Sequence, residues 1–148
     1  MTAFRIASAP ILPKGARRKP RVVPDAPGQR KPRERDRDHL GCVAQLSCVV
    51  CGAWPVHVAH VRYTSAADGA PLVGKQEKPS DSRTVPLCPI CHLDGPDAQH
   101  KSGEAVWWRE VGINPYALAR ALYGCSGDVE LMRQLVAKAR MMFPARVE

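Results

Sequence analysis

Apolar and β-branched residues are spaced so that two short strands are predicted ahead of a helical C-terminal third. Apolar residues at helical spacing predict a short helix over 38–47. Alternating patterns predict one strand that starts at residue 54 and ends near His60, and a second over 83–87, which Pro86 marks as an edge strand or the end of a strand. Gly, Pro, Ser and Asp dominate 64–82, which we expect to be a long loop. The pattern therefore predicts an α+β fold.

Glycine, proline and short polar residues divide the C-terminal third into helices. A helical segment over 104–111 ends before a glycine, and the Asn-Pro pair at 114–115 is typical of the start of a helix, which we expect over 116–123. Ser126 or Asp128 caps a last helix, whose apolar residues recur at helical spacing. The residues expected in the core are Trp107, Tyr116, Leu118, Leu122, Val129, Met132, Leu135, Val136, Ala139 and Met142.

Positive charge is concentrated at the N-terminus. Residues 1–37 hold eleven of the 22 Lys and Arg, six prolines and only three of the 14 Asp and Glu. A segment of this composition buries too little apolar surface to fold, so we expect a disordered, Pro-rich basic arm over 1–37 and a folded, nearly neutral domain over 38–148. Such an arm is suited to the phosphate backbone of DNA, and the alternative is a solubilising tail. The candidate arm contacts are Arg17, Arg18, Lys19 and Arg21.

The six cysteines are interpreted against the expected cellular setting. The chain has no apolar run typical of a signal peptide or a membrane span, so we expect a cytoplasmic protein with no membrane partner. In a reducing compartment, cysteines serve as metal ligands more often than as disulfides. Cys42 and Cys125 have no partner at ligand spacing and are expected to be small buried apolar residues.

The other four cysteines form two Cys-x-x-Cys pairs, Cys48 with Cys51 and Cys88 with Cys91. Each such turn directs two thiolates at one point, and two turns supply the four sulfurs of a tetrahedral structural zinc site. A redox motif is the alternative, but it needs only one pair beside a βαβ pattern, which the chain does not present.

Four of the five histidines surround these pairs: His57, His60, His92 and His100. His60 ends the first predicted strand, and alternation along that strand places His57 on the opposite face. A zinc ion would hold the second pair beside the same strand, so we expect His60, His92 and His100 to converge. Neutral imidazole suits both metal binding and general-base catalysis.

The order of these motifs resembles that of HNH endonucleases of the ββα-metal superfamily. The resemblance covers about residues 40–115 and rests on the first cysteine pair, Ala59-His60-Val61-Arg62, and Pro86-Leu87-Cys88-Pro89-Ile90-Cys91-His92. Together with Lys78-Pro79-Ser80-Asp81, His100 and Trp107-Trp108, the set is similar to Ref-like and YbcO-like nucleases associated with phage and prophage recombination.

The resemblance implies a small zinc-stabilised ββα-metal core (the HNH or His-Me finger) followed by C-terminal helices. It implies a DNA endonuclease or nickase that leaves a 5′ phosphate, in which His60 is the general base and His92 a ligand of a second, catalytic divalent metal, Mg²⁺, Mn²⁺ or Zn²⁺. DNA is then the substrate, a RecA-like recombinase filament a candidate partner, and the cytoplasm of a bacterial host the setting.

The chain departs from the family pattern at two positions. Arg83 stands where the family has Asn, so Asp81 is expected to orient His60 instead. Ala59 stands where the family often has a metal ligand, and His100, or after it His57, is expected to replace that ligand. Candidate phosphate contacts in the domain are Arg62, Lys78 and Arg83.

Two other interpretations remain open at the level of sequence. One is a non-catalytic zinc module that binds nucleic acid or a recombination protein, with structural histidines. The other is a pair of structural zinc sites completed by His57 and His92.

Overall fold

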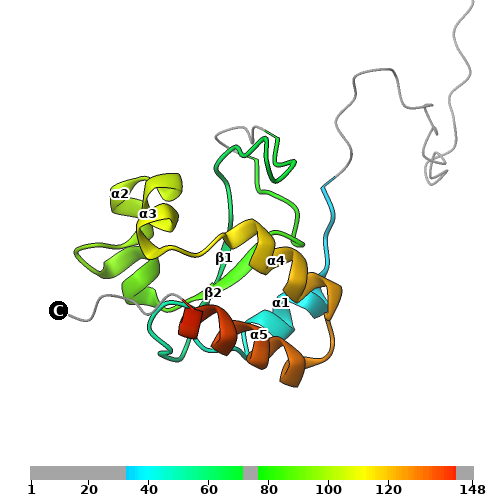
Figure 1. The fold of residues 1–148 in the computed structure, drawn as a ribbon. Coiled ribbons are helices and arrows are strands. Elements are labelled where there is room, and N and C mark those ends of the chain that lie inside the picture. The colour runs from blue at the N-terminus through cyan, green and yellow to red at the C-terminus, as the bar shows by residue number, and fades with distance from the viewer. Residues whose placement is uncertain (1–32, 72–76, 143–148) are drawn as a thin grey trace, which may run out of the picture. The chain divides into compact units, whose positions relative to one another are not determined.

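Two short antiparallel strands lie among five α-helices in the computed structural model, which describes residues 33–71 and 77–142 (Figure 1). The elements in chain order are α1 (Arg37–Val43), β1 (His57–His60), β2 (Thr84–Leu87), a π-helical turn η1 (Ile90–Asp94), α2 (Gln99–Ser102), α3 (Glu104–Val111), α4 (Pro115–Gly124) and α5 (Val129–Met142). The fold class is α+β, as predicted. No helix in the described part of the chain is long and apolar enough to cross a membrane.

The strands pair so that His57 lies opposite Leu87 and His60 opposite Thr84. All four residues of β2 are buried, which makes this strand the centre of the domain. Both strands are shorter than predicted. The lost residues at the start of β1 belong to the loop that follows the first cysteine pair. The proline in β2 is tolerated because its missing N–H needs no partner, while its carbonyl accepts the backbone N–H of Val49 at 3.1 Å.

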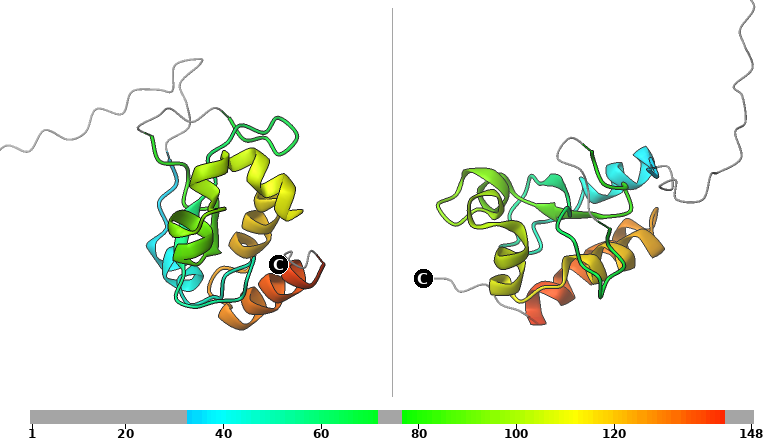
Figure 2. Two further views of the ribbon diagram at one scale, coloured as in Figure 1. Left: turned by 90° about the vertical axis from the view of Figure 1, so that its left-hand side faces the viewer. Right: turned by 90° about the horizontal axis from the view of Figure 1, so that it is seen from above.

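Helices cover the sheet and enclose the core. α1 and α4 pack on β2, α5 packs on α1 and α4, and α2 and α3 lie with η1 at the other end of the sheet (Figures 1 and 2). The largest fully buried side chains include Leu46, Leu87, Trp108, Leu122 and Met132. Each such side chain contributes about 1.5–3 kcal/mol by leaving water, so this core fixes the framework on which the polar site is built.

Capping residues explain where the helices begin and end. Asn114 accepts a hydrogen bond from the N–H of Ala117 at 3.0 Å, and Asp128 accepts one from Leu131 at 3.0 Å, as predicted for the starts of α4 and α5. Gly112 ends α3 in the left-handed conformation, with φ of 81°.

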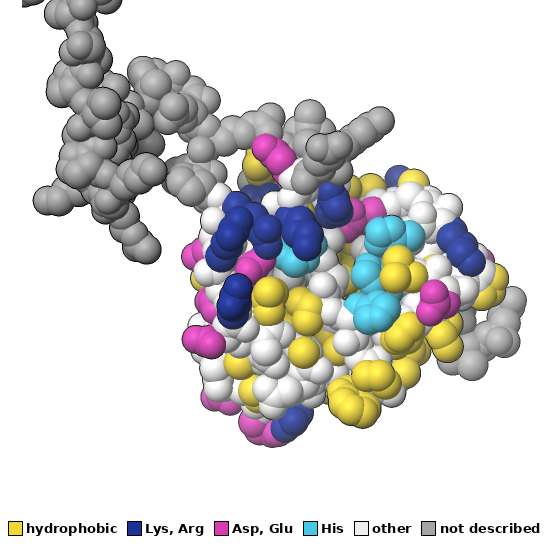
Figure 3. Space-filling model, turned by 180° about the vertical axis from the view of Figure 1, so that it is seen from behind, with side chains coloured by type: hydrophobic (Ala, Val, Ile, Leu, Met, Phe, Trp, Pro, Cys, Tyr) yellow, Lys and Arg dark blue, Asp and Glu magenta, His cyan; other side chains and the backbone are white. Residues whose placement is uncertain are grey.

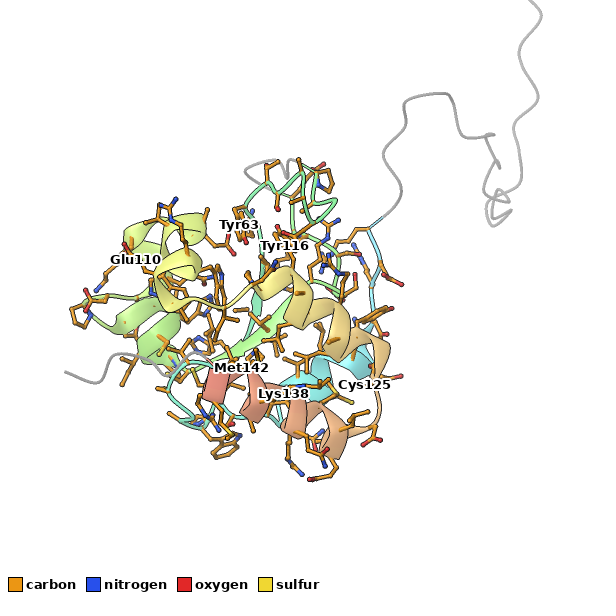
Figure 4. All side chains as sticks on the ribbon, viewed as in Figure 1. Tyr63, Glu110, Tyr116, Cys125, Lys138 and Met142 are labelled. Carbon is orange, nitrogen blue, oxygen red and sulfur yellow. The ribbon has the colours of Figure 1, made fainter. Side chains whose placement is uncertain are left out.

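The loop after β1 is tied to α4 through two tyrosines. The Tyr116 hydroxyl donates a hydrogen bond to the carbonyl of Tyr63, and the two ring centroids lie 5.0 Å apart (Figure 4). Burial, the largest influence, raises the pKa of Tyr116, so the hydroxyl stays protonated and able to donate at neutral pH.

Three sequence-based expectations need correction. The folded domain begins before residue 38, because residues 33–36 already hydrogen-bond to the loop before β2. The rest of the predicted arm, residues 1–32, lies outside the described residues. Met142 is 63% exposed and not part of the core, since the stripe of α5 leaves the domain at its last turn. Cys42 and Cys125 are half-buried and not fully buried.

Candidate metal centre and histidine pocket

The two Cys-x-x-Cys turns bring four sulfurs together. The ligand atoms of Cys48, Cys51, Cys88 and Cys91 all lie within 4.8 Å of one another. The Cys51 sulfur lies 3.5 Å from that of Cys88 and 3.7 Å from that of Cys91. Metal–sulfur bonds of about 2.3 Å place the corners of a regular ZnS₄ tetrahedron about 3.8 Å apart. The spacing and the donor set therefore fit a metal ion such as zinc, as the sequence predicts.

The thiols of the cluster differ in pKa because of the hydrogen bonds between them and because of burial. The bond with the Cys91 thiol is the largest influence on Cys48; it outweighs the opposing effect of burial, and the pKa of Cys48 is lowered to about 4. The same bond raises the pKa of Cys91, and burial raises that of Cys51. The pKa of the Cys48 thiol therefore lies below those of Cys51 and Cys91, and the thiolate is the form that binds zinc.

Backbone contacts hold each turn in shape. In the first, the N–H of Gly52 donates to the Cys48 carbonyl at 2.9 Å, and Gly52 has a φ of 79°, which favours glycine. In the second, the N–H of Cys91 points at the Cys88 sulfur at 3.4 Å, and the N–H of His92 donates to the Cys88 carbonyl at 2.9 Å. The second turn runs directly into η1, so His92 is placed by the cluster itself.

Three histidines meet beside this turn. Nδ1 of His57 lies 3.0 Å from Nδ1 of His92, and the ring centroid of His100 lies 4.9 Å from that of His92. Two imidazole nitrogens bound to one ion at about 2.1 Å would lie about 3.0–3.4 Å apart at bond angles near 90–110°. His57 and His92 therefore fit two positions of one ion. His57, which was the second choice from sequence, makes this nitrogen contact with His92, although the ring centroid of His57 lies 5.2 Å from that of His92, slightly farther than the centroid of His100.

His92 is suited to metal binding in its protonation state as well. Burial first, and then the positive charges of His100 and His57, lower the pKa of His92 to about 4. The ring is neutral at neutral pH, which leaves a nitrogen lone pair for an ion. Among the described residues, only the four cysteines bring three or more ligand atoms within 4.8 Å of each other, so the three histidines do not form such a group.

His60 is held by a carboxylate, as expected. Its Nε2 lies 3.1 Å from Oδ1 of Asp81, across the turn that leads into β2. Burial alone would raise the pKa of Asp81, but hydrogen bonds from Arg33, from His60 and from the N–H of Asp36 together lower it to about 2. Asp81 is therefore ionised at neutral pH. Arg83 does not take part in this contact, and it precedes the residue that pairs with His60 in the sheet.

A pocket of about 150 Å³ opens beside His60. Its lining residues are His60, Arg62, Gln99, His100 and Glu104. Both carboxylate oxygens of Glu104 accept the backbone N–H of Arg62 at 3.0 Å, and one also accepts the amide of Gln99 at 3.2 Å. Burial raises the pKa of Glu104. The pocket thus brings the end of β1 together with α2 and the start of α3.

Basic side chains lie next to the histidines. In the view from behind, histidines occupy the middle of the face, with a group of Lys and Arg side chains to one side of them (Figure 3). Of the predicted phosphate contacts, Arg62 and Lys78 are exposed and Arg83 is half-buried. The guanidinium of Arg62 donates to the Glu77 carbonyl at 2.9 Å. The predicted contacts Arg17, Arg18, Lys19 and Arg21 lie outside the described residues.

Sequence reasoning missed three residues of this region: Arg33, Gln99 and Glu104. Arg33 was assigned to the arm on composition alone. Gln99 and Glu104 carry no motif, and only a structure brings them to the end of β1. An acidic residue in the first turn of a helix is favoured by the helix dipole, which explains Glu104 locally but gives no sign of a pocket.

Comparison with protein-family models, curated proteins and solved structures gives no match to this chain. The fold and the site nevertheless define a class: a small α+β protein in which four cysteines are placed to hold a metal ion such as zinc. Beside that cluster lie a histidine pair and a histidine–aspartate pair.

Proposed function

We propose that this protein is a metal-dependent DNA endonuclease or nickase of the HNH, ββα-metal type, which hydrolyses a phosphodiester bond and leaves a 5′ phosphate. The observation that carries the proposal is the contact of His60 with Asp81 at a pocket that His60 shares with His100. The resemblance of the ordered motifs supports it and adds the setting, phage or prophage DNA recombination or repair in a bacterial host, with a RecA-like filament as candidate partner.

The chemistry assigned to His60 follows from the state of Asp81. An ionised carboxylate only accepts hydrogen bonds, so His60 directs its Nε2–H toward Asp81. In the neutral ring, Nδ1 is then the nitrogen without a proton. Nδ1 is the atom that would take a proton from the attacking water, and a positioned general base of this kind accelerates a reaction about 10²- to 10⁴-fold.

His57 and His92, whose Nδ1 atoms lie 3.0 Å apart, are the residues best placed to hold the second metal, and the ring of His100 lies beside that of His92. A divalent ion bound there, Mg²⁺, Mn²⁺ or Zn²⁺, would stabilise negative charge on the scissile phosphate and on the departing 3′ oxygen. The four cysteines have a different task, because a closed sulfur shell leaves no open position for a substrate. They hold His92 next to the strand that carries His60.

DNA is the substrate class that the surface favours. Arg62 lines the pocket, and Lys78 and Arg83 lie in the segments that lead to β2. These side chains would contact phosphates, which position a duplex without reading its sequence. The eleven Lys and Arg of residues 1–37 add a sequence-independent attraction for the same polyanion.

Cleavage of supercoiled plasmid by the zinc-loaded full chain, with Mg²⁺ or Mn²⁺ added, tests the proposal. We expect nicked product that DNA ligase reseals without prior phosphorylation, because the ends carry 5′ phosphate and 3′ hydroxyl. His60→Ala should lower the rate about 10²-fold or more while DNA affinity is kept. Lys138→Ala, which removes an exposed charge on α5, serves as the control. Cleavage by His60→Ala at the wild-type rate would show that His60 is not the base.

A non-catalytic zinc module that binds nucleic acid is the second candidate function. It is favoured by the grouping of metal ligands, since in the described part of the chain only the cysteines form a cluster of three or more. Metal analysis after dialysis separates the two functions. The nuclease requires an exchangeable divalent site in addition to the tightly held zinc, whereas the binding module retains a single ion and does not cut DNA.

A further inference from the structure

Asp81 is contacted by a residue that the chain supplies from outside the predicted domain. Nη2 of Arg33 lies 2.5 Å from Oδ1 of Asp81, the same oxygen that His60 contacts at 3.1 Å. The other oxygen, Oδ2, accepts the backbone N–H of Asp36 at 3.0 Å. We propose that Arg33 is a positioning residue, which fixes the carboxylate of Asp81 and through it the ring of His60. Its effect on catalysis rests on the function proposed above.

The backbone around Arg33 is anchored independently of its guanidinium. The carbonyl of Glu34 accepts the N–H of Asp81 at 3.0 Å, and the N–H of Glu34 donates to the hydroxyl of Ser80 at 3.0 Å. These bonds lay residues 33–36 along the turn that carries Asp81. A substitution of the Arg33 side chain therefore leaves the backbone of residues 33–36 in place. The consequences of the substitution can then be assigned to the lost guanidinium.

Arg33 differs from the arginine two positions along the chain. The side chain of Arg33 is only 29% exposed and that of Asp81 only 4%, so their contact is largely shielded from water. Arg35 is exposed, and the described residues provide it with no ionic partner. The two residues carry the same charge on the same segment. This makes Arg35 a matched control for any general effect of charge on DNA binding.

The arrangement determines what the carboxylate can do. A buried carboxylate needs a charged or hydrogen-bonding partner, and with Arg33 it has three donors in fixed directions. Without the guanidinium, the carboxylate can rotate about its last bond and exchange His60 for water. His60 would then lose the hydrogen bond that orients its ring, and the direction of Nδ1 would no longer be fixed.

The test uses the zinc-loaded full chain with Arg33→Gln, Arg33→Lys and Arg35→Gln. The first measurement is the solvent exchange of the His60 Nε2–H proton in ¹⁵N-resolved NMR spectra. We expect a protected proton in the wild type, exchange about tenfold faster or more in Arg33→Gln, recovery in Arg33→Lys, and no change in Arg35→Gln. Absence of the protected proton from the wild type, or equal exchange in Arg33→Gln, would overturn the proposal.

The second measurement is the single-turnover rate of plasmid nicking. Arg33→Gln should lower this rate by about 10- to 100-fold, as loss of a residue that orients a functional side chain does. DNA affinity should fall equally in Arg33→Gln and Arg35→Gln, because each removes one positive charge. A normal rate in Arg33→Gln would make Arg33 a structural contact only.

The two proposals fail separately. If the wild type does not cut DNA, the proposed function fails, while the NMR measurement still decides whether Arg33 holds the Asp81–His60 pair. If the wild type cuts DNA and the NMR signature is unchanged in Arg33→Gln, the nuclease stands and the role of Arg33 falls.

Discussion

Arg140 in the last helix donates hydrogen bonds to the first metal-binding turn. Its Nη1 lies 3.0 Å from the carbonyl oxygen of Cys48 and 3.3 Å from the hydroxyl of Ser47. α5 lies outside residues 40–115, which carry the sequence motifs of the cysteines and histidines, yet it supports the turn on which the cysteine cluster depends. The last helix is therefore part of the framework that holds the cysteine cluster.

Arg140→Ala should destabilise the zinc-loaded protein. It removes hydrogen bonds from a charged, half-buried donor, for which we expect about 1–3 kcal/mol in denaturant unfolding. Zinc should also pass to a competing chelator more quickly. Arg133→Ala is the control, because Arg133 forms an exposed pair with Glu130 in the same helix, and such pairs contribute about 0–1 kcal/mol. Equal losses in both variants would contradict a specific role for Arg140.

Gly52→Ala should weaken the contact between Arg140 and the first metal-binding turn, because the added side chain would stand against the guanidinium. Gly52 has a φ of +79°, and a Cβ there would stand 2.9 Å from Nη1 of Arg140. The left-handed conformation alone costs about 1–2 kcal/mol for a residue with a side chain, and the guanidinium must also move. Gly41→Ala in α1 meets nothing within 4 Å and should stabilise by about 0.5–1 kcal/mol. Thermal unfolding should therefore move in opposite directions for the two variants.

Removal of the metal should unfold the domain. Cys48 and Cys51 lie in the loop before β1, and Cys88 and Cys91 lie in the turn after β2. A metal ion bound by all four would therefore link the segment that precedes the sheet to the segment that follows it. We expect one zinc per chain, and loss of cooperative unfolding when a strong chelator removes it. Cys91→Ser should reproduce this loss, whereas Cys125→Ser, at a half-buried position away from the cluster, should retain zinc and fold. Cooperative unfolding of the metal-free chain would show that the core suffices.

The parts of the fold that were predicted correctly depend on local signals. Gly112 ends a helix, and Asn114 with Pro115 begins the next, through contacts within a few residues, so a short stretch of sequence reveals them. The four-cysteine cluster was also predictable, because the spacing within each Cys-x-x-Cys turn determines how its two sulfurs point. The turn η1 was not predicted, since its geometry follows from the metal-binding turn before it.

The site was predictable only in part, because some of its contacts join residues that are far apart in the sequence. Asp81 was expected to orient His60 because it stands two residues before Arg83, the position of the family's Asn, on the same face of the predicted strand, and its carboxylate does contact His60. Arg33 reaches the same carboxylate from 48 residues away. Within its own segment it is indistinguishable from the other arginines of a basic, proline-rich stretch. Only the tertiary contact separates it from them.

His39 should make stability depend on pH in the acidic range. Its side chain is fully buried, Nδ1 lies 2.9 Å from the hydroxyl of Ser126, and Nε2 has no hydrogen-bond partner among the described residues. Burial, outweighing the nearby carboxylates, lowers its pKa below 6.5. The unfolded chain then binds the proton first, so the free energy of unfolding should decrease as the pH falls below about 6.5.

His39→Asn provides the comparison for this pH effect, because it removes the titrating group and leaves the cysteines unchanged. The free energy of unfolding of both proteins is measured with denaturant at several pH values from neutral to acidic. We expect it to fall less steeply with decreasing pH in the variant than in the wild type. Zinc loss at low pH affects both proteins alike and cancels in the difference. Identical slopes would show that His39 is not the source of the pH dependence.

The second metal should depend on His57 more than on His100. The ring centroids of His57 and His100 lie at similar distances from that of His92, 5.2 and 4.9 Å. Only His57 directs a nitrogen at His92, with 3.0 Å between the two Nδ1 atoms, a separation that one ion can span, whereas no hydrogen bond joins His100 to His92 in the described part of the chain. Binding of Mn²⁺ to the zinc-loaded protein is measured by the decrease of the EPR signal of the free ion. We expect His57→Ala and His92→Ala each to lower the affinity for Mn²⁺ at least about tenfold. His100→Ala should have the smaller effect, and His39→Asn none. The reverse order for His57 and His100 would mean that the ion draws α2 inward, and that the ligand choice made from sequence is the correct one.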